Sequence, residues 1–220
     1  MEFYLDTADV KIVKKMHRTF PLSGVTTNPS IVAKSARPLF DVLSELQEIF
    51  GEKGLLFAQV IARNGEEMVD EALKLREHIP SLVVKVPVIS EGLYAIKKLT
   101  QLNVPTLGTA VYGAVQGLLS AAAGAKYVAP YVNRIDSQGG NGITVVSELQ
   151  SLLTLHTPQS MVLAASFRTP RQVLDCLLTG CRGVTVSPDI AEAFIADPAV
   201  FAALDTFDAD WEKAFGKTTG

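Results

Sequence analysis

A lysine interrupts a mostly apolar segment of the chain. Lys85 lies in SLVVKVPV, where the residue types predict a strand over residues 82–86. Side chains alternate between the two faces of a strand, so Val84 and Val86 take one face and Lys85 takes the other. An apolar setting lowers the pKa of a lysine, and the neutral amine is the nucleophile that Schiff-base chemistry needs. The alternative is a lysine that reaches the rim of the sheet or pairs with an acid.

Polar side chains also fall near the carboxyl ends of six other expected strands. The same alternation places Asp6 on the face of Tyr4 and away from Leu5, for example. Polar groups on buried strands are costly unless they reach an opening. One such residue would indicate little, but six strands that each supply one predict a site. The residues are Asp6, Thr26, Asn28, Gln59, Thr109, Tyr131, Ser166 and Arg168.

Two arginines suggest what such a site could bind. Arg134 follows the expected strand over residues 127–132, and Arg168 follows the one over residues 161–166. Guanidinium groups grip phosphate oxygens in bidentate fashion, so the two could converge on an anion with help from Ser166. The alternative for either arginine is a solvated surface residue.

Other common chemistries have little support in the sequence. The histidines His17, His78 and His156 fall on expected helices or helix ends, away from the polar residues of the strands. Because no histidine is expected beside Ser166, a Ser-His-Asp mechanism is not indicated. The sequence contains no HExxH, no CxxC and no cluster of carboxylates, so we expect neither a metal nor another cofactor.

The expected strands alternate with longer amphipathic segments. One of these is SEGLYAIKKLTQL (90–102), where Ser90 is a fair N-cap and Gly92 a mild counter-signal. Eight strand–helix units in 220 residues indicate a (β/α)8 TIM barrel, whose sites lie at the carboxyl ends of the strands. A doubly wound sheet is the runner-up, but the glycine-rich phosphate turn that it requires is missing. The expected strands cover residues 3–6, 24–27, 55–61, 82–86, 105–110, 127–132, 161–166 and 183–186.

Composition and charge limit the classes of molecule that the protein is expected to bind. A net charge of −3 and a pI of about 5.6 give no basic face for nucleic acid, whereas an anionic small molecule needs only a few local cations. No apolar run approaches the roughly 18 residues of a membrane span, and the N-terminus lacks the pattern of a signal peptide. Cys176 and Cys181 are expected to be reduced and packed. We therefore expect a single cytoplasmic domain over residues 1–220.

An apolar stripe marks the last segment, residues 197–220. Five apolar side chains recur there at spacings of 4, 3, 4 and 4, which predicts one face of a helical extension. This helix could lie on its own barrel or dock on a neighbouring subunit. The stripe consists of Val200, Leu204, Phe207, Trp211 and Phe215.

Several longer motifs carry a resemblance that extends over nearly the whole chain. They are LDTAD (5–9), GVTTNPS (24–30), VVKVP (83–87), TLGTAVY (106–112), YVAPYVNRIDSQGG (127–140), AASFRTPRQ (164–172) and the terminal WEKAFGKT (211–218). The pairing of TTNPS with the lysine of KVP is specific. Together these motifs resemble the fructose-6-phosphate aldolases of the transaldolase family.

The resemblance implies a metal-independent aldolase that works through a lysine Schiff base. In that family the lysine at the position of Lys85 condenses with the C2 carbonyl of the substrate. The residues matching Asp6 and Asn28 hold substrate hydroxyls and the intermediate, and we group Thr26 with them as substrate-binding. The catalytic water and proton transfer are assigned to Gln59, Thr109 and Tyr131, and the phosphate to Arg134, Ser166 and Arg168.

Three positions bear on the type of reaction. Transaldolases have glutamate where this chain has Gln59 and phenylalanine where it has Tyr131, so both positions follow the aldolase pattern. Arg168 departs from it, because the resembling aldolases have lysine there and transaldolases have arginine. The resemblance thus implies aldolase chemistry and leaves the preferred phosphorylated substrate open.

The reaction implied is the reversible cleavage of fructose 6-phosphate to dihydroxyacetone and glyceraldehyde 3-phosphate. One alternative is a transaldolase, in which the dihydroxyacetone unit stays on Lys85 until an aldose phosphate accepts it. Another is a non-catalytic sugar-phosphate binder, although binding alone does not require a buried amine. The resembling aldolases form rings of five that pair into decamers, which implies a large homo-oligomer in which the terminal helix crosses a subunit boundary.

Overall fold

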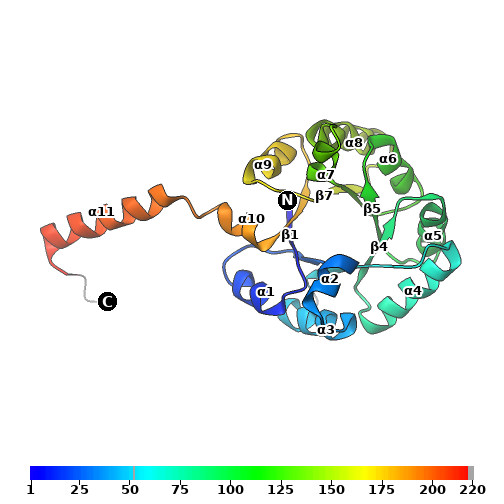
Figure 1. Cartoon of the computed structure of the whole chain (residues 1–220), viewed down its shortest axis with the longest axis horizontal. Helices are drawn as coiled ribbons and strands as arrows, with labels where there is room; N and C mark the ends of the chain where they lie inside the picture. Colours follow the sequence, from blue (N-terminus) through cyan, green and yellow to red (C-terminus); the bar gives the residue numbers. More distant parts are fainter. Residues whose placement is uncertain (52, 218–220) are drawn as a thin grey trace.

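The computed structural model describes residues 1–51 and 53–217, which form a closed barrel of eight parallel strands (Figure 1). Neighbours in the ring are neighbours in the sequence, and β1 closes the ring by pairing with β8. The expected (β/α)8 barrel is therefore confirmed, and the alternative of a doubly wound open sheet is wrong. The strands are β1 (Glu2–Asp6), β2 (Gly24–Thr26), β3 (Leu55–Gln59), β4 (Val83–Pro87), β5 (Thr106–Val111), β6 (Tyr127–Pro130), β7 (Met161–Ala164) and β8 (Gly183–Val186).

The strands lie where the sequence predicts them, with differences at some carboxyl ends. The expected strand over residues 127–132 stops at Pro130, because a helix begins directly after Tyr131. The one over residues 161–166 also stops early, because Ser166 has a φ of 64° and leaves the extended conformation. The one over residues 55–61 ends two residues early as well, at Gln59. These three differences fall at the end of the barrel where the polar residues gather.

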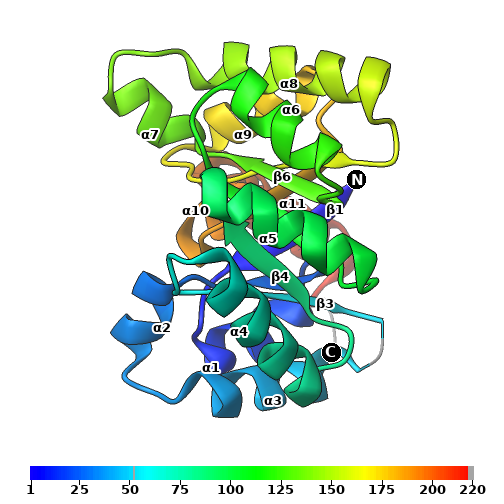
Figure 2. The ribbon, with the colours of Figure 1, turned by 90° about the vertical axis from the view of Figure 1, so that its right-hand side faces the viewer.

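Helices surround the strands, as Figure 2 shows from the side. Most of them lie between consecutive strands and return the chain to the start of the next one. The described residues form α1 (Val10–His17), α2 (Pro29–Ser35), α3 (Leu39–Phe50), α4 (Gly65–His78), α5 (Ser90–Gln101), α6 (Ala114–Ala122), α7 (Val132–Ser137), α8 (Gly142–His156), α9 (Pro170–Leu178), α10 (Pro188–Ala193) and α11 (Pro198–Phe215).

The N-cap of α5 differs from the residue that the sequence predicts. Ile89, and not Ser90, is the N-cap residue, and its carbonyl accepts a hydrogen bond from the amide of Leu93 at 2.8 Å. Gly92 lies in this first turn, where an added Cβ would stand 1.8 Å from the carbonyl oxygen of Pro87. The helix therefore begins tightly against the end of β4, and glycine permits this approach.

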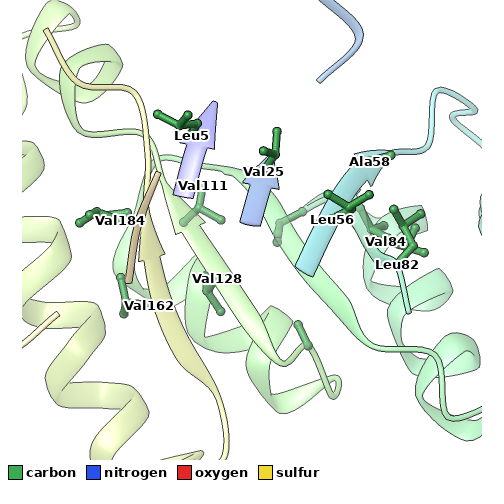
Figure 3. Packing of buried hydrophobic residues seen from close by; sticks show 14 of the residues in the cluster. Leu5, Val25, Leu56, Ala58, Leu82, Val84, Val111, Val128, Val162 and Val184 are labelled. Atoms are coloured by element: carbon green, nitrogen blue, oxygen red, sulfur yellow. The ribbon is translucent and has the colours of Figure 1, made fainter. Parts of the chain in front are cut away.

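Two apolar layers are buried on either side of the strands. Side chains such as Leu5, Val84 and Val184 belong to the layer between strands and helices (Figure 3). Val83 belongs to the layer inside the barrel, so the alternation expected along β4 is confirmed. The interior layer consists of Tyr4, Phe57, Val83, Leu107, Tyr127, Ala129, Leu163 and Ala165.

The last helix, α11, stands away from the barrel (Figure 1). None of its residues is buried, and the five residues of the apolar stripe are between 50% and 74% exposed. The alternative in which this helix lies on its own barrel is therefore wrong, because the chain after α10 leads outward. Residues 218–220 of the expected 197–220 extension lie outside the described residues.

The remaining sequence expectations concern histidines and cysteines. His17, His78 and His156 are the last residues of α1, α4 and α8, as expected. Cys176 and Cys181 are buried and free. Among the helices described, none combines the length and the apolar character needed to cross a membrane.

Candidate active site

Lys85 is the one charged residue among the buried side chains of the described chain, at 5% exposure. It lies on the inward face of β4, two residues after Val83. Its Nζ donates a hydrogen bond to the carbonyl oxygen of Thr27 at 2.7 Å. Burial lowers the pKa of Lys85, the Asp6 carboxylate opposes that shift, and the positive charge of Arg134 adds to it. The net shift of the pKa is downward, towards the neutral amine that acts as the nucleophile.

A chain of hydroxyl groups ends on the carboxylate of Asp6. Thr26 donates to Oδ1 of Asp6 at 2.7 Å, and its Oγ1 lies 2.7 Å from that of Thr185. Because a threonine hydroxyl has a single proton, Thr185 is the donor in the second contact. Thr185 was not among the sequence candidates, although it is a polar residue on an otherwise apolar strand, β8. The chain of hydroxyls fixes the Asp6 carboxylate at the end of β1.

The turn that follows β2 brings its backbone to the lysine and orients Asn28. Thr27 accepts from Lys85 through its carbonyl, while its hydroxyl donates to the carbonyl of Phe57 at 2.9 Å. Asn28 caps α2, and its Oδ1 accepts from the amide of Ile31 at 3.0 Å. Since this oxygen serves the helix, the amide nitrogen of Asn28 is the group suited to bind a hydroxyl oxygen.

Gln59 is placed beside the lysine by strand register. It is the last residue of β3, and its Cα partner on β4 is Lys85. Paired residues of parallel strands direct their side chains to the same face, so Gln59 shares the inward face with the amine. Gln59 is partly exposed, in contrast to the buried Lys85. An amide there can hold a water molecule or a substrate hydroxyl beside the nucleophile.

Thr109 and Tyr131 form a second polar pair. The hydroxyl of buried Thr109, on β5, lies 2.8 Å from the phenol oxygen of Tyr131, directly after β6. Burial raises the pKa of Tyr131, while the Thr109 hydroxyl and the charge of Arg134 oppose the shift. The ring also packs edge-on against Tyr112, with centroids 5.8 Å apart. A neutral phenol held in this way can donate a proton.

The candidate anion-binding residues lie on the neighbouring loops after β6 and β7. Arg134 belongs to α7, and its guanidinium lies 4.6 Å from the centre of the Tyr131 ring. The amide of Asn133 donates to the carbonyl of Ser166 at 2.7 Å, which ties the two loops together. Arg134 and Arg168 are both exposed. Two exposed cations beside a polar mouth are suited to a phosphate.

A side-chain link that the sequence did not reveal joins the same loops. Gln172 on α9 accepts from the backbone amide of Arg168 at 2.8 Å and donates to Oδ2 of Asp136 at 2.8 Å. The other oxygen of Asp136 accepts from the amide of Gly142 at 2.7 Å, at the start of α8. The backbones that carry both arginines are therefore connected through Asp136 and Gln172.

Two solved structures of other proteins share the fold. A mutant of flavocytochrome B2 matches with a TM-score of 0.61 at 13% identity, over 85% of this chain and 56% of that one. A cube-shaped, highly porous protein cage, designed by fusing symmetric oligomeric domains, matches with a TM-score of 0.59 at 14% identity, over 97% and 77%. This chain thus spans little more than half of the flavocytochrome. At such identities the likeness shows the barrel fold alone.

The comparison with families is more specific. The family described as Transaldolase/Fructose-6-phosphate aldolase matches residues 3–218 of the 220. The match covers the barrel and every candidate residue from Asp6 to Arg168. The chain therefore belongs to the transaldolase/fructose-6-phosphate aldolase family.

Proposed function

We propose that this protein is a class I aldolase that reversibly cleaves fructose 6-phosphate to dihydroxyacetone and glyceraldehyde 3-phosphate. Its family supports transaldolase- or aldolase-type activity through a lysine Schiff base. The observation that carries the proposal is Lys85, an amine buried inside the barrel and hydrogen-bonded to a backbone carbonyl. Burying a lysine is costly, and a neutral amine beside a carboxylate is suited to attack a carbonyl.

The first stage forms the Schiff base. The neutral Nζ of Lys85 attacks the C2 carbonyl of the ketose. One amine proton moves to the former carbonyl oxygen and a second proton is taken up from solvent water, so that this oxygen leaves as water. The iminium that results is cationic, and the nearby carboxylate of Asp6 favours it electrostatically. Asn28 and Thr26 bind hydroxyl groups of the bound sugar.

The second stage breaks the C3–C4 bond. The electron pair of this bond moves into the iminium, which becomes an enamine, and the C4 hydroxyl loses its proton as the aldehyde forms. Tyr131, a neutral phenol, relays this proton: it accepts it while giving its own to a water held by Gln59 and Thr109. Asp6 is the other candidate and would act as the base directly. Protonation of the enamine at C3 and hydrolysis then release dihydroxyacetone and regenerate Lys85. The iminium is itself the electron sink, so the proposed reaction needs no metal.

The phosphate of the substrate binds outside this polar cluster. Arg134, Ser166 and Arg168 form the proposed anion site, with the connection through Asp136 and Gln172 holding the loops in register. A phosphate held there fixes the distance between its own end of the sugar and the amine. This fixed distance favours a phosphorylated ketose over a shorter ketose without a phosphate.

Transfer of the dihydroxyacetone unit to an aldose phosphate is the second candidate, since the family includes transaldolases. Arg168 favours it, because transaldolases have arginine at this position and the resembling aldolases have lysine. Gln59 and Tyr131 favour hydrolysis of the intermediate, and therefore cleavage. A coupled assay on fructose 6-phosphate, with and without erythrose 4-phosphate, separates the two: an aldolase releases free dihydroxyacetone without the acceptor, and a transaldolase does not.

The exposed stripe of α11 supports a homo-oligomer, and the resemblance suggests a decamer of two five-membered rings. An 18-residue helix with large apolar side chains in solvent is unfavourable for an isolated chain. An apolar pocket lies beside the segment that leads into α11, lined by Phe3, Phe20, Leu174 and Phe194 among others. We propose that α11 crosses a subunit boundary and is covered by another copy of the chain.

A further inference from the structure

The backbone of β5 is kinked beside the Thr109–Tyr131 pair. Gly108 pairs with Val128 and Val111 with Pro130, so β5 advances three residues while β6 advances two. The extra residue is accommodated at Ala110, whose φ of 56° is unusual for a side chain other than glycine. Strained backbone of this kind persists only where its surroundings hold it in place.

The side chain of Gln116, on α6, holds this kink with three hydrogen bonds. Its Nε2 donates to the carbonyl of Ala110 at 3.1 Å and to that of Val88 at 2.9 Å. Its Oε1 accepts from the amide of Tyr112 at 2.8 Å. Both hydrogens of the amide and its oxygen are thus used by backbone groups on either side of the kink and on the loop after β4.

The segment held by Gln116 carries two residues that contact Tyr131. Thr109 directly precedes Ala110 and contacts the Tyr131 hydroxyl, and Tyr112 follows the kink and packs on the Tyr131 ring. Burial raises the pKa of Tyr131, and the Thr109 hydroxyl, the Arg134 charge and the Ala110 backbone are among the groups that shift it. A change in the backbone conformation at the kink would therefore shift both Thr109 and Tyr112 relative to the Tyr131 phenol.

We propose that Gln116 is a positioning residue for Tyr131: it fixes the β5 kink that sets Thr109 and Tyr112 around the phenol. The inference rests on the proposed role of Tyr131 in proton transfer. Gln116 does not itself reach the reacting atoms, and its effect passes through Ala110 to the phenol. A small displacement of the phenol would matter, because misplacement of a reacting group by about 1 Å can lower a rate about 10²-fold.

The test is Gln116→Met, which keeps the length of the side chain and removes all three hydrogen bonds. We expect kcat for dihydroxyacetone release to fall roughly ten- to a hundred-fold, with little change in KM for fructose 6-phosphate. Borohydride trapping of the Lys85 adduct should continue, because the amine is on another strand. The matched control is Gln150→Met, since Gln150 lies on α8 and bonds only Thr154 among the described side chains; its kcat should equal that of the parent.

A double-mutant cycle distinguishes positioning from a general loss of structure. If Gln116 acts through the phenol, Gln116→Met should lower kcat less than about two-fold in a Tyr131→Phe background, because the effects of coupled residues are not additive. An equal loss in both backgrounds would overturn the inference while leaving the aldolase intact. Should Tyr131→Phe cleave as fast as the parent, the proposed role of Tyr131 fails, and the inference fails with it.

A second variant covers the case in which Gln116→Met does not fold. Gln116→Glu keeps an oxygen for the amide of Tyr112, but an ionised carboxylate cannot donate to the carbonyls of Ala110 and Val88. We expect the same loss of kcat, partly restored at lower pH, where a protonated carboxyl can donate one hydrogen bond. A kcat equal to the parent's at all pH values would contradict the proposal.

Discussion

The phenol of Tyr131 and the hydroxyl of Thr109 lie 2.8 Å apart, although they come from separate strand ends. Thr109 is fully buried, and burial also raises the pKa of Tyr131, so the phenol remains protonated in the ordinary pH range. A protonated phenol can give a proton and recover it through the hydroxyl beside it. This pair is therefore the proposed route for protons during enamine protonation and imine hydrolysis.

The first prediction removes this route. Tyr131→Phe keeps the ring against Tyr112 but lacks the phenol, so kcat for cleavage should fall by about 10²–10⁴-fold, the usual contribution of a general acid–base group. The Lys85 adduct should still form. The measurement is the steady-state release of dihydroxyacetone from fructose 6-phosphate. Unchanged turnover would make Tyr131 a packing residue, and Asp6 would take its place as the base.

The second prediction concerns product partitioning. Without rapid protonation the enamine on Lys85 lives longer and can meet an acceptor aldehyde. Tyr131→Phe and Gln59→Glu should each raise the ratio of sedoheptulose 7-phosphate to free dihydroxyacetone when erythrose 4-phosphate is present. A ratio equal to the parent's in both variants would show that these two positions do not separate aldolase from transaldolase.

Much of the barrel follows from the sequence alone. Strand–helix alternation and the absence of a glycine-rich phosphate turn distinguish the closed barrel from an open sheet. Alternation along β4 places Lys85 on the same face as Val83 and on the other face from Val84. The structure agrees, because Val83 lies inside the barrel and Val84 lies between the strands and the helices. These features are local, because each depends on side-chain type at a spacing of one or two residues.

The features that sequence reasoning missed depend on contacts between distant segments. The kink at Ala110 and the positive φ of Ser166 have no glycine to indicate them. Gln116 reads as an ordinary helix residue, and only the structure brings it to the Val88 carbonyl, 28 residues earlier. The link between Asp136 and Gln172 spans 36 residues in the same way. The direction of α11 was also open, since an apolar stripe does not identify what covers it.

The third prediction tests the phosphate site. Arg134→Ala and Arg168→Ala should each raise KM for fructose 6-phosphate about ten- to a hundred-fold, because a charge-assisted hydrogen bond contributes about 1.5–3 kcal/mol. KM for unphosphorylated dihydroxyacetone in the synthetic direction should change far less. The control is Arg171→Ala, an exposed arginine of α9 paired with Asp175. Equal losses for both substrates would place the phosphate elsewhere.

The fourth prediction uses the lowered pKa of Lys85. Between this pKa and that of an unfolded lysine, about 10.4, the unfolded chain binds more protons, so the free energy of unfolding rises with pH. Lys85→Met removes the ionisable group and its contribution to this slope. The stability of the parent relative to Lys85→Met should therefore increase as pH rises through the window, as followed by denaturant unfolding. A difference that is constant with pH would mean that the lysine is not perturbed.

The fifth prediction concerns assembly. Because the stripe of α11 is exposed in the single chain, the full-length protein should be a large homo-oligomer by light scattering, and truncation before Asp197 should dissociate it. Trp211→Ser should weaken assembly, whereas Asp205→Ser, away from the stripe, should not. A monomeric full-length protein would refute the proposal, and an unchanged oligomer after truncation would move the interface to another surface.

The most direct test of the account is covalent trapping at Lys85. Borohydride reduces an iminium but not a free amine, so incubation with fructose 6-phosphate or dihydroxyacetone should inactivate the enzyme and label one peptide, that of Lys85. The label and the inactivation should persist in EDTA and in Lys98→Ala, where Lys98 is an exposed lysine of α5. Lys85→Ala should be neither labelled nor active. Labelling at another lysine, or cleavage by Lys85→Ala, would contradict the Schiff-base mechanism.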